Sequence, residues 1–231
     1  LELPRSFGEG PVGFRSEADP DVLVQPVLQE KSSVFVDIIW DVHTILSSNR
    51  TRFFAEFHAL PALGFMTYRI QKGYVAKIPA PDIVQAPFTL ENAFLRVKVG
   101  RNGTVDILNK STRKVYRDCG YLTDEGEVGN AWEHASPKRD RKMDSRGGKA
   151  KLRTIVNGPL VGGIRAEYEF RVPKDYADGN SRSKELVGLP VTVEYRLEAG
   201  STCLKVRIAL DNRARDHWLR VNFPTDLRTD L

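Results

Sequence analysis

Long runs in which apolar and polar residues alternate restrict the fold of this chain more than any other feature of its sequence. Every second side chain is apolar from residue 163 to 172, and residues 187–197 and 203–210 repeat the pattern. A period of two places the apolar side chains on one face of a β-strand. No stretch of helical length shows a 3.6-residue period. The sequence therefore predicts an all-β fold with long strands in large antiparallel sheets, in which 187–197 and 203–210 present matching apolar faces.

A proline-rich stretch divides the β pattern into two blocks. Residues 78–87 contain three prolines and predict an extended linker. The first block has shorter β runs at 22–27, 34–40, 52–59 and 65–71, with a polar turn at 46–52. We therefore expect a small β-sandwich domain over residues 1–75, a proline-rich linker over 76–90, and a second β-domain over 91–231. A hairpin should open that domain, with its turn at Asn102-Gly103 and both of these residues at positive φ.

A polar stretch from Asp124 to Ser145 interrupts the second block. It holds four carboxylates, at positions 124, 125, 127 and 133, together with Trp132 and His134. A chemically rich loop on a rigid scaffold is typical of a binding site. The alternative is a solvated acidic loop with a buried Trp, since charged residues are seldom buried. A third reading is that two of the carboxylates form the catalytic pair of a glycosidase, which depends on a separation that the sequence does not show.

Several other function classes lack support in the sequence. Phosphate-binding loops, Gly-x-Ser-x-Gly and His-Glu-x-x-His are absent, and the four histidines are scattered, so no metal site is expected. The basic run Lys138–Lys142 is interrupted by Asp140 and lacks aromatic residues, which indicates a solvated rim and no nucleic-acid partner. No apolar run approaches about 18 residues, so no membrane span is expected.

The cysteines and the targeting signals add little. Cys119 and Cys203 are far apart in apolar contexts and are expected to be buried free thiols, although a disulfide is left open. No signal peptide is visible, and the three matches to the N-glycosylation pattern arise often by chance. The expected location is cytoplasmic, and a homo-oligomer is left open.

Four stretches of the chain resemble segments of the family 38 glycoside hydrolases, the α-mannosidases. They occur in the family's order and cover about residues 55–231. They are FHALPALGFMTY (57–68), Leu90-Glu91-Asn92 with Asn102-Gly103-Thr104 and Leu108, YLTDEGEVGNAWEHASP (121–137), and Asp211-Asn212 with His217–Val221.

The resemblance implies a fold and a supporting function. The chain resembles the C-terminal β region of a retaining α-mannosidase: a small β-sandwich, then part of a galactose-mutarotase-like supersandwich that ends before the family domain usually does. In this family the zinc, its ligands, the nucleophile and the acid/base lie in an N-terminal domain. Its His-x-Asp pair is absent here. The resemblance therefore implies no catalytic residue, metal ligand or cofactor in this segment, zinc in the full-length enzyme, and inactivity of the segment alone.

The resemblance also points to candidate substrate-binding residues. Trp132 stands where many family members carry a Tyr that borders the mannose subsite, and Asn130 stands where many carry Asp. Trp132, Asn130 and Glu133 are accordingly expected to contact an α-mannoside, with the N-terminal catalytic domain of the same protein as partner. Two alternatives remain: Trp132 fills the core between this chain and the catalytic domain, or the chain is a free-standing carbohydrate-binding or interaction module.

Overall fold

The computed structural model describes residues 2–4, 12–36, 44–58, 60–73, 81–130, 132–177 and 181–227. These residues contain no α-helix, and the prediction of an all-β fold is confirmed. They divide into two compact units. The smaller unit comprises residues 1–82 with 158–161, and the larger comprises 83–157 with 162–231.

The smaller unit contains two antiparallel sheets. Its first sheet has the strand order β1-β4-β3, and β2 pairs with β5 in the second. The strands are β1 (Glu2–Pro4), β2 (Val12–Arg15), β3 (Leu23–Val36), β4 (Thr44–Glu56) and β5 (Arg69–Lys72). The prediction of a turn at residues 46–52 is wrong, because this polar segment is the middle of β4 and pairs with residues 28–34 of β3. Residues 37–40 of the expected strand 34–40 lie outside the described part.

A buried glutamine fixes one loop of the smaller unit. The side chain of Gln25 donates from Nε2 to the carbonyl of Val161 at 2.8 Å. Its Oε1 accepts from the backbone N–H groups of Leu160 and Val161, each at 2.8 Å. Gln25 is only 4% exposed, so these bonds satisfy an amide that would be costly to bury alone.

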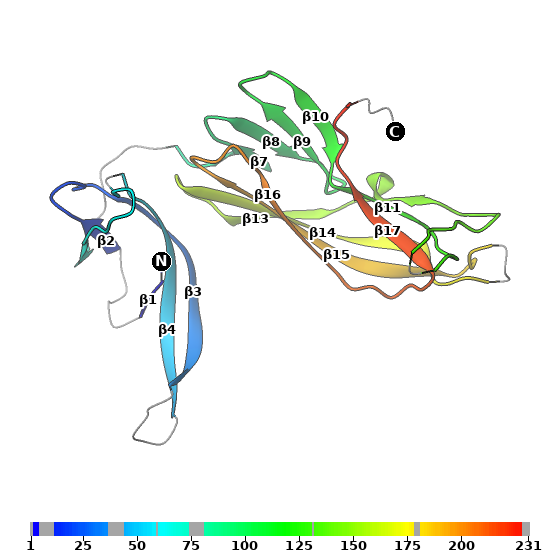
Figure 1. Cartoon of the computed structure of the whole chain (residues 1–231), viewed down its shortest axis with the longest axis horizontal. Helices are drawn as coiled ribbons and strands as arrows, with labels where there is room; N and C mark the ends of the chain where they lie inside the picture. The colour runs from blue at the N-terminus through cyan, green and yellow to red at the C-terminus, as the bar shows by residue number, and fades with distance from the viewer. Residues whose placement is uncertain are drawn as a thin grey trace. The chain divides into compact units, whose positions relative to one another are not determined.

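The larger unit contains three antiparallel sheets, with the orders β10-β9-β8-β7-β6, β12-β11-β17 and β13-β14-β15-β16 (Figure 1). The elements are β6 (Val84–Ala86), β7 (Thr89–Glu91), β8 (Leu95–Val99), β9 (Val105–Asn109), β10 (Val115–Cys119), β11 (Tyr121–Gly126), β12 (Met143–Asp144), the 3-10 helix η2 (Ser145–Gly147), β13 (Lys151–Val156), β14 (Val161–Pro173), β15 (Leu186–Glu198), β16 (Lys205–Leu210) and β17 (His217–Asn222). Strand β6 and the first two residues of β7 lie within the range 76–90 expected for the linker.

Strands β14 and β15 follow the sequence pattern closely. On β15, Val191, Val193, Tyr195 and Leu197 are buried. Val191 pairs with Leu210 of β16, and the pairing continues in this register along both strands. The apolar faces of β14 and β15 form one core with residues of β7, β8 and β9. The five-stranded and four-stranded sheets of this unit therefore share a single hydrophobic core.

The hairpin between β8 and β9 forms at the expected place with a different turn. The N–H of Gly103 donates to the carbonyl of Gly100 at 3.0 Å, and only Gly103 of the Asn102-Gly103 pair has positive φ, at 86°. A Cβ at Gly103 would lie 3.0 Å from the ring of Tyr168. The carbonyl of Gly103 also accepts a 2.6 Å bond from the buried hydroxyl of Tyr195. Glycine is therefore required here by both backbone and packing.

Candidate functional site: the Trp132 hairpin

The polar stretch begins as a strand and not as a loop. Strand β11 continues through Gly126 and pairs with β17 in a register that places Asp124 opposite Leu219 and Glu125 opposite Trp218. The chain then turns back, and the N–H of Val128 donates to the carbonyl of Ala135 at 2.8 Å. Residues 127–136 are called the Trp132 hairpin below. It follows directly after the end of β11.

The three candidate substrate-binding residues lie together at the tip of this hairpin. The Oδ1 atom of Asn130 accepts hydrogen bonds from the backbone N–H groups of Trp132 at 2.9 Å and Glu133 at 3.0 Å. Asn130 thus builds the turn with its own side chain. Glu133 is exposed, and the side chain of Trp132 is 89% exposed. Contact of the three with a sugar stays a prediction, but Trp132 fills no core among the described residues.

His134 holds the hairpin on the sheet. Its Nδ1 is hydrogen-bonded to Oε2 of Glu127, and its ring lies 3.9 Å from the ring of Trp218 at an angle of 55°. The other oxygen of Glu127 accepts from the N–H groups of Gly129 at 2.6 Å and Ala135 at 3.1 Å. The bond from His134, followed by these two backbone bonds, lowers the pKa of Glu127 from 4.5 to about 2. Glu127 is therefore a structural carboxylate that joins both strands of the hairpin.

A second carboxylate lies beneath the hairpin. Glu125 is 4% exposed and is paired with Lys142 at 2.7 Å and with Arg220. Hydrogen bonding from Lys142 is the largest cause of its lowered pKa, although burial opposes the shift. The guanidinium of Arg220 also lies 4.5 Å from the centre of the Trp218 ring. Trp218 is therefore sandwiched in a network that connects β11, β17 and the hairpin.

A third carboxylate is completely buried. Asp124 is 0% exposed; its Oδ1 accepts from Arg182 at 2.5 Å and its Oδ2 lies 2.5 Å from Nδ1 of His217. The Nε2 of His217 lies 3.1 Å from the side-chain oxygen of Asn212. The expectation that Asp124 and Glu125 are solvent-exposed because they are charged is wrong. Both are buried, and each forms ion pairs with cationic residues distant in sequence.

Sequence reasoning missed Arg182 and the role of His217. Arg182 lies in a polar loop that has no hydrophobic periodicity or motif to single it out. Its partner Asp124 lies 58 residues away in the sequence. His217 lies in a segment selected for its family resemblance, but nothing local indicates a bond to a residue 93 positions earlier. Among the described residues, no group of three or more His, Cys, Asp or Glu side chains is placed to hold a metal ion.

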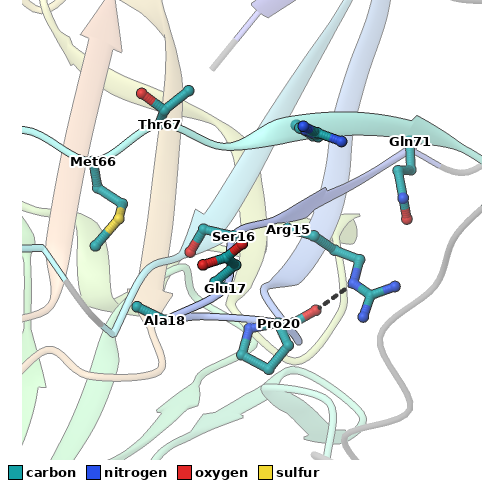
Figure 2. A pocket seen from close by; sticks show the side chains of 9 residues that line it. Arg15, Ser16, Glu17, Ala18, Pro20, Met66, Thr67 and Gln71 are labelled. Carbon is teal, nitrogen blue, oxygen red and sulfur yellow. Dashed lines mark hydrogen bonds between the residues drawn. The ribbon is translucent and has the colours of Figure 1, made fainter.

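In the smaller unit a pocket is lined by residues of 15–20 and 66–71, and Arg15 donates there to the carbonyl of Pro20 at 3.1 Å (Figure 2). Glu17 is the only carboxylate among its described lining residues, so the pocket lacks the pair that glycoside hydrolysis uses.

Cys119 is a buried free thiol as expected, whereas Cys203 is free but exposed, so its predicted burial is wrong.

The fold is similar to part of two solved glycoside hydrolase structures. The chain is similar to the crystal structure of an alpha-mannosidase from Enterococcus faecalis V583, with a TM-score of 0.79 and 18% identity, over 99% of this chain and 29% of that one. A crystal structure described as a glycosyl hydrolase family 38 protein, also from Enterococcus faecalis, matches with a TM-score of 0.75 and 17% identity, over 99% of this chain and 30% of that one.

The family itself follows from the sequence. Residues 90–230 match the model described as "Glycosyl hydrolases family 38 C-terminal domain". The chain therefore belongs to glycosyl hydrolase family 38, as its motifs suggested. It is 30% identical over 153 residues to a "Putative mannosylglycerate hydrolase" from Halalkalibacterium halodurans C-125, over 60% of this chain. It spans 17% of the length of that relative. No helix among the described residues has the length and apolar character needed to cross a membrane.

Proposed function

We propose that this chain is the C-terminal β region of a retaining α-mannosidase-type hydrolase, which supports an active site formed elsewhere in the same polypeptide and is inactive alone. The observation that carries the proposal is the Trp132 hairpin. Its indole is 89% exposed, yet Asn130, Glu127 and His134 hold the backbone that presents it. An exposed aromatic side chain on a fixed support is a feature of surfaces that receive a ligand or a partner.

The carboxylates of the site support the view that catalysis occurs elsewhere. A retaining glycosidase needs one carboxyl group that stays protonated near neutral pH and a second that acts as nucleophile. Hydrogen bonding lowers the pKa of both glutamates, from Lys142 to Glu125 and from His134 and two backbone N–H groups to Glu127, which is the opposite of what a general acid requires. Asp124 is fully enclosed between Arg182 and His217, without access to a substrate.

The zinc that the family implies does not fit the described residues, which provide no group of ligands for it. We therefore place the metal in the remainder of the full-length enzyme and derive no step through it here. The proposed partners of this chain are that catalytic domain and the substrate. The proposed substrates are α-mannosides, and the relative named as a putative mannosylglycerate hydrolase adds a mannoside of glycerate as a specific candidate.

The proposed role of Trp132 is to contact the sugar. One face of a pyranose ring is lined by C–H groups, which pack well on the π-face of an indole, while the indole N–H can bond a hydroxyl. In the full-length enzyme, Trp132→Ala should lower kcat/KM about 10- to 100-fold, equivalent to about 1–3 kcal/mol of transition-state stabilisation. Trp132→Tyr keeps an aromatic face and should retain most of the activity. Equal activity of the Ala variant and the wild type would reject the sugar contact.

The isolated chain provides a separate test of inactivity and of the alternative function. It should not hydrolyse an aryl α-mannoside, and zinc should not induce turnover. A free-standing carbohydrate-binding module would instead bind a mannoside without any catalytic domain, using the same exposed indole. Titration of the isolated chain with methyl α-mannoside, followed by Trp fluorescence, distinguishes the two. Binding in the low millimolar range that Trp132→Ala abolishes would favour the module.

A further inference from the structure

A groove in the larger unit lies between the β8–β9 hairpin and the 3-10 helix η2. It has a volume of about 730 Å³ and is lined by residues 101–102 and 146–150 together with Phe88 and Leu152. That volume falls in the range of about 300–1,000 Å³ typical of small-molecule sites. These residues are called the Arg101–Lys149 groove below. The proposed role of Trp132 uses none of them.

The walls of this groove are fixed by bonds between the two segments. The N–H of Ala150 donates to the carbonyl of Arg101 at 2.7 Å, and the side-chain amide of Asn102 donates to the carbonyl of Arg146 at 3.2 Å. Asp144 caps η2 by accepting from the backbone N–H of Arg146 at 2.8 Å. The shape of the groove is thus largely formed before any ligand enters, which lowers the entropic cost of binding.

Two positive charges in the groove are not neutralised. Arg146 forms an ion pair with Asp144 at 2.6 Å, and its guanidinium lies 4.2 Å from the centre of the Tyr121 ring. Arg101 and Lys149 are exposed, and neither side chain forms an ion pair or hydrogen bond with any residue that the structure describes. Unpaired cations at the rim of a formed groove attract anionic ligands, and guanidinium groups bind phosphate and carboxylate well.

An aromatic residue in a strained conformation lines the same groove. Pro87 and Phe88 form the two-residue turn between β6 and β7, and Phe88 has a φ of 58°. Turns with positive φ at this position normally use glycine, and a bulky residue there costs about 1–3 kcal/mol. Phe88 is half-buried and packs against the core, as Ala150 and Leu152 do. The strained turn thus places an apolar ring beside the two free cations.

We propose that the Arg101–Lys149 groove binds a sugar that carries a phosphate or carboxylate group. The anionic group bonds Arg101 and Lys149, and the apolar face of the sugar ring packs on Phe88. The cations bind the anionic group, and the apolar lining binds the sugar ring. Cations alone would bind any small anion, and an apolar lining alone would bind a neutral sugar only weakly. This binding is independent of the proposed role of Trp132.

Four probes titrated into the 15N-labelled chain test the proposal by NMR: glucose 6-phosphate, glucuronate, glucose and inorganic phosphate. We expect the two charged sugars to shift the amide signals of residues 100–103 and 146–150, with at least about 10-fold higher affinity than glucose or phosphate and a Kd of about 1 mM or below. Raising the salt concentration should weaken binding, since the cations are exposed. Equal affinity for phosphate and glucose 6-phosphate would overturn the sugar site.

Variants separate the groove from general charge effects. Arg101→Gln and Lys149→Gln should each weaken binding of glucose 6-phosphate about 3- to 10-fold, in line with loss of one charged hydrogen bond. Lys151→Gln removes an exposed charge from neighbouring β13 outside the groove and should leave the affinity unchanged. A loss for Lys151→Gln as large as that for Lys149→Gln would overturn the proposal. Asparagine tolerates positive φ, so Phe88→Asn should lower the affinity for glucose 6-phosphate but not for inorganic phosphate. If this variant fails to fold, the Arg101 and Lys149 variants test the proposal.

Discussion

Replacing Asp124 by asparagine would measure how much the buried cluster of Asp124, Arg182 and His217 stabilises the larger unit. The side chains of Asp124 and Arg182 are 0% and 1% exposed, and 2.5 Å separates Oδ1 from Nη2. Asparagine preserves the shape of the aspartate but removes its charge, which leaves a guanidinium buried without its counter-ion. Loss of one member of a buried pair costs about 3–5 kcal/mol, so Asp124→Asn should lower the free energy of unfolding by that amount.

A double-mutant cycle separates the pair from the packing around it. Arg182→Met should also be strongly destabilising, because it leaves the carboxylate of Asp124 with His217 alone. The double variant buries no unpaired charge, so its cost should be smaller than the sum of the two single costs by at least about 1 kcal/mol. The matched control is Glu167→Gln, which breaks the exposed pair with Arg153 at 2.8 Å and should cost less than about 1 kcal/mol.

Urea unfolding followed by far-ultraviolet circular dichroism provides the measurement. Asp124→Asn should lower the midpoint by at least about 1 M without a change in slope, since the surface exposed on unfolding stays the same. Thermal unfolding of the same variants offers an independent check. A cost below about 1 kcal/mol for Asp124→Asn, or strictly additive costs in the cycle, would refute the reasoning that this ion pair is buried and directly coupled.

Three further predictions concern the hairpins. In the isolated chain, Trp132→Ala should change the free energy of unfolding by less than about 0.5 kcal/mol, measured by urea unfolding, because the indole is exposed. Folding lowers the pKa of Glu127 from 4.5 to about 2, so its stabilisation is complete above pH 4.5 and is lost as the pH falls to about 2; Glu127→Gln should lack this loss in NMR spectra of the hairpin. Gly103→Ala should lower stability by about 1–2 kcal/mol in thermal unfolding, because its φ is 86° and the added Cβ meets Tyr168 at 3.0 Å.

The sequence correctly predicted the strands that bury one face and expose the other. Strands β14 and β15 bury one face in the shared core, so an alternating pattern records their conformation directly. The matching apolar faces of 187–197 and 203–210 predicted that the two strands pair, whereas the register that brings Val193 opposite Ile208 is known only from the structure. The polar segment 46–52 was misjudged for the complementary reason. Its strand conformation comes from pairing with β3, and a backbone ladder leaves little trace in the order of polar residues.

The site was harder to predict than the fold, because its charges are paired over long sequence separations. The sequence drew attention to residues 124–145 as a group, and the structure shows three carboxylates there with three different environments. Asp124 is sealed with Arg182, Glu125 lies with Lys142 and Arg220, and Glu127 holds the hairpin. The sequence could not show which of these carboxylates is buried, because the environment of each one depends on a partner that only the folded chain brings close to it.

The exposed indole of Trp132 contributes little to the stability of this chain, and its proposed role is in function. Burying a large apolar side chain stabilises a protein by about 1.5–3 kcal/mol, and Trp132 lacks that gain because its indole is exposed, although Asn130 holds its backbone. Both a catalytic domain and a sugar would cover the ring, and they predict different effects of Trp132→Ala in the full-length enzyme. A domain contact lowers the melting temperature and leaves kcat/KM of the folded enzyme unchanged. A sugar contact lowers kcat/KM at constant melting temperature, because the indole then meets its partner only when substrate is bound.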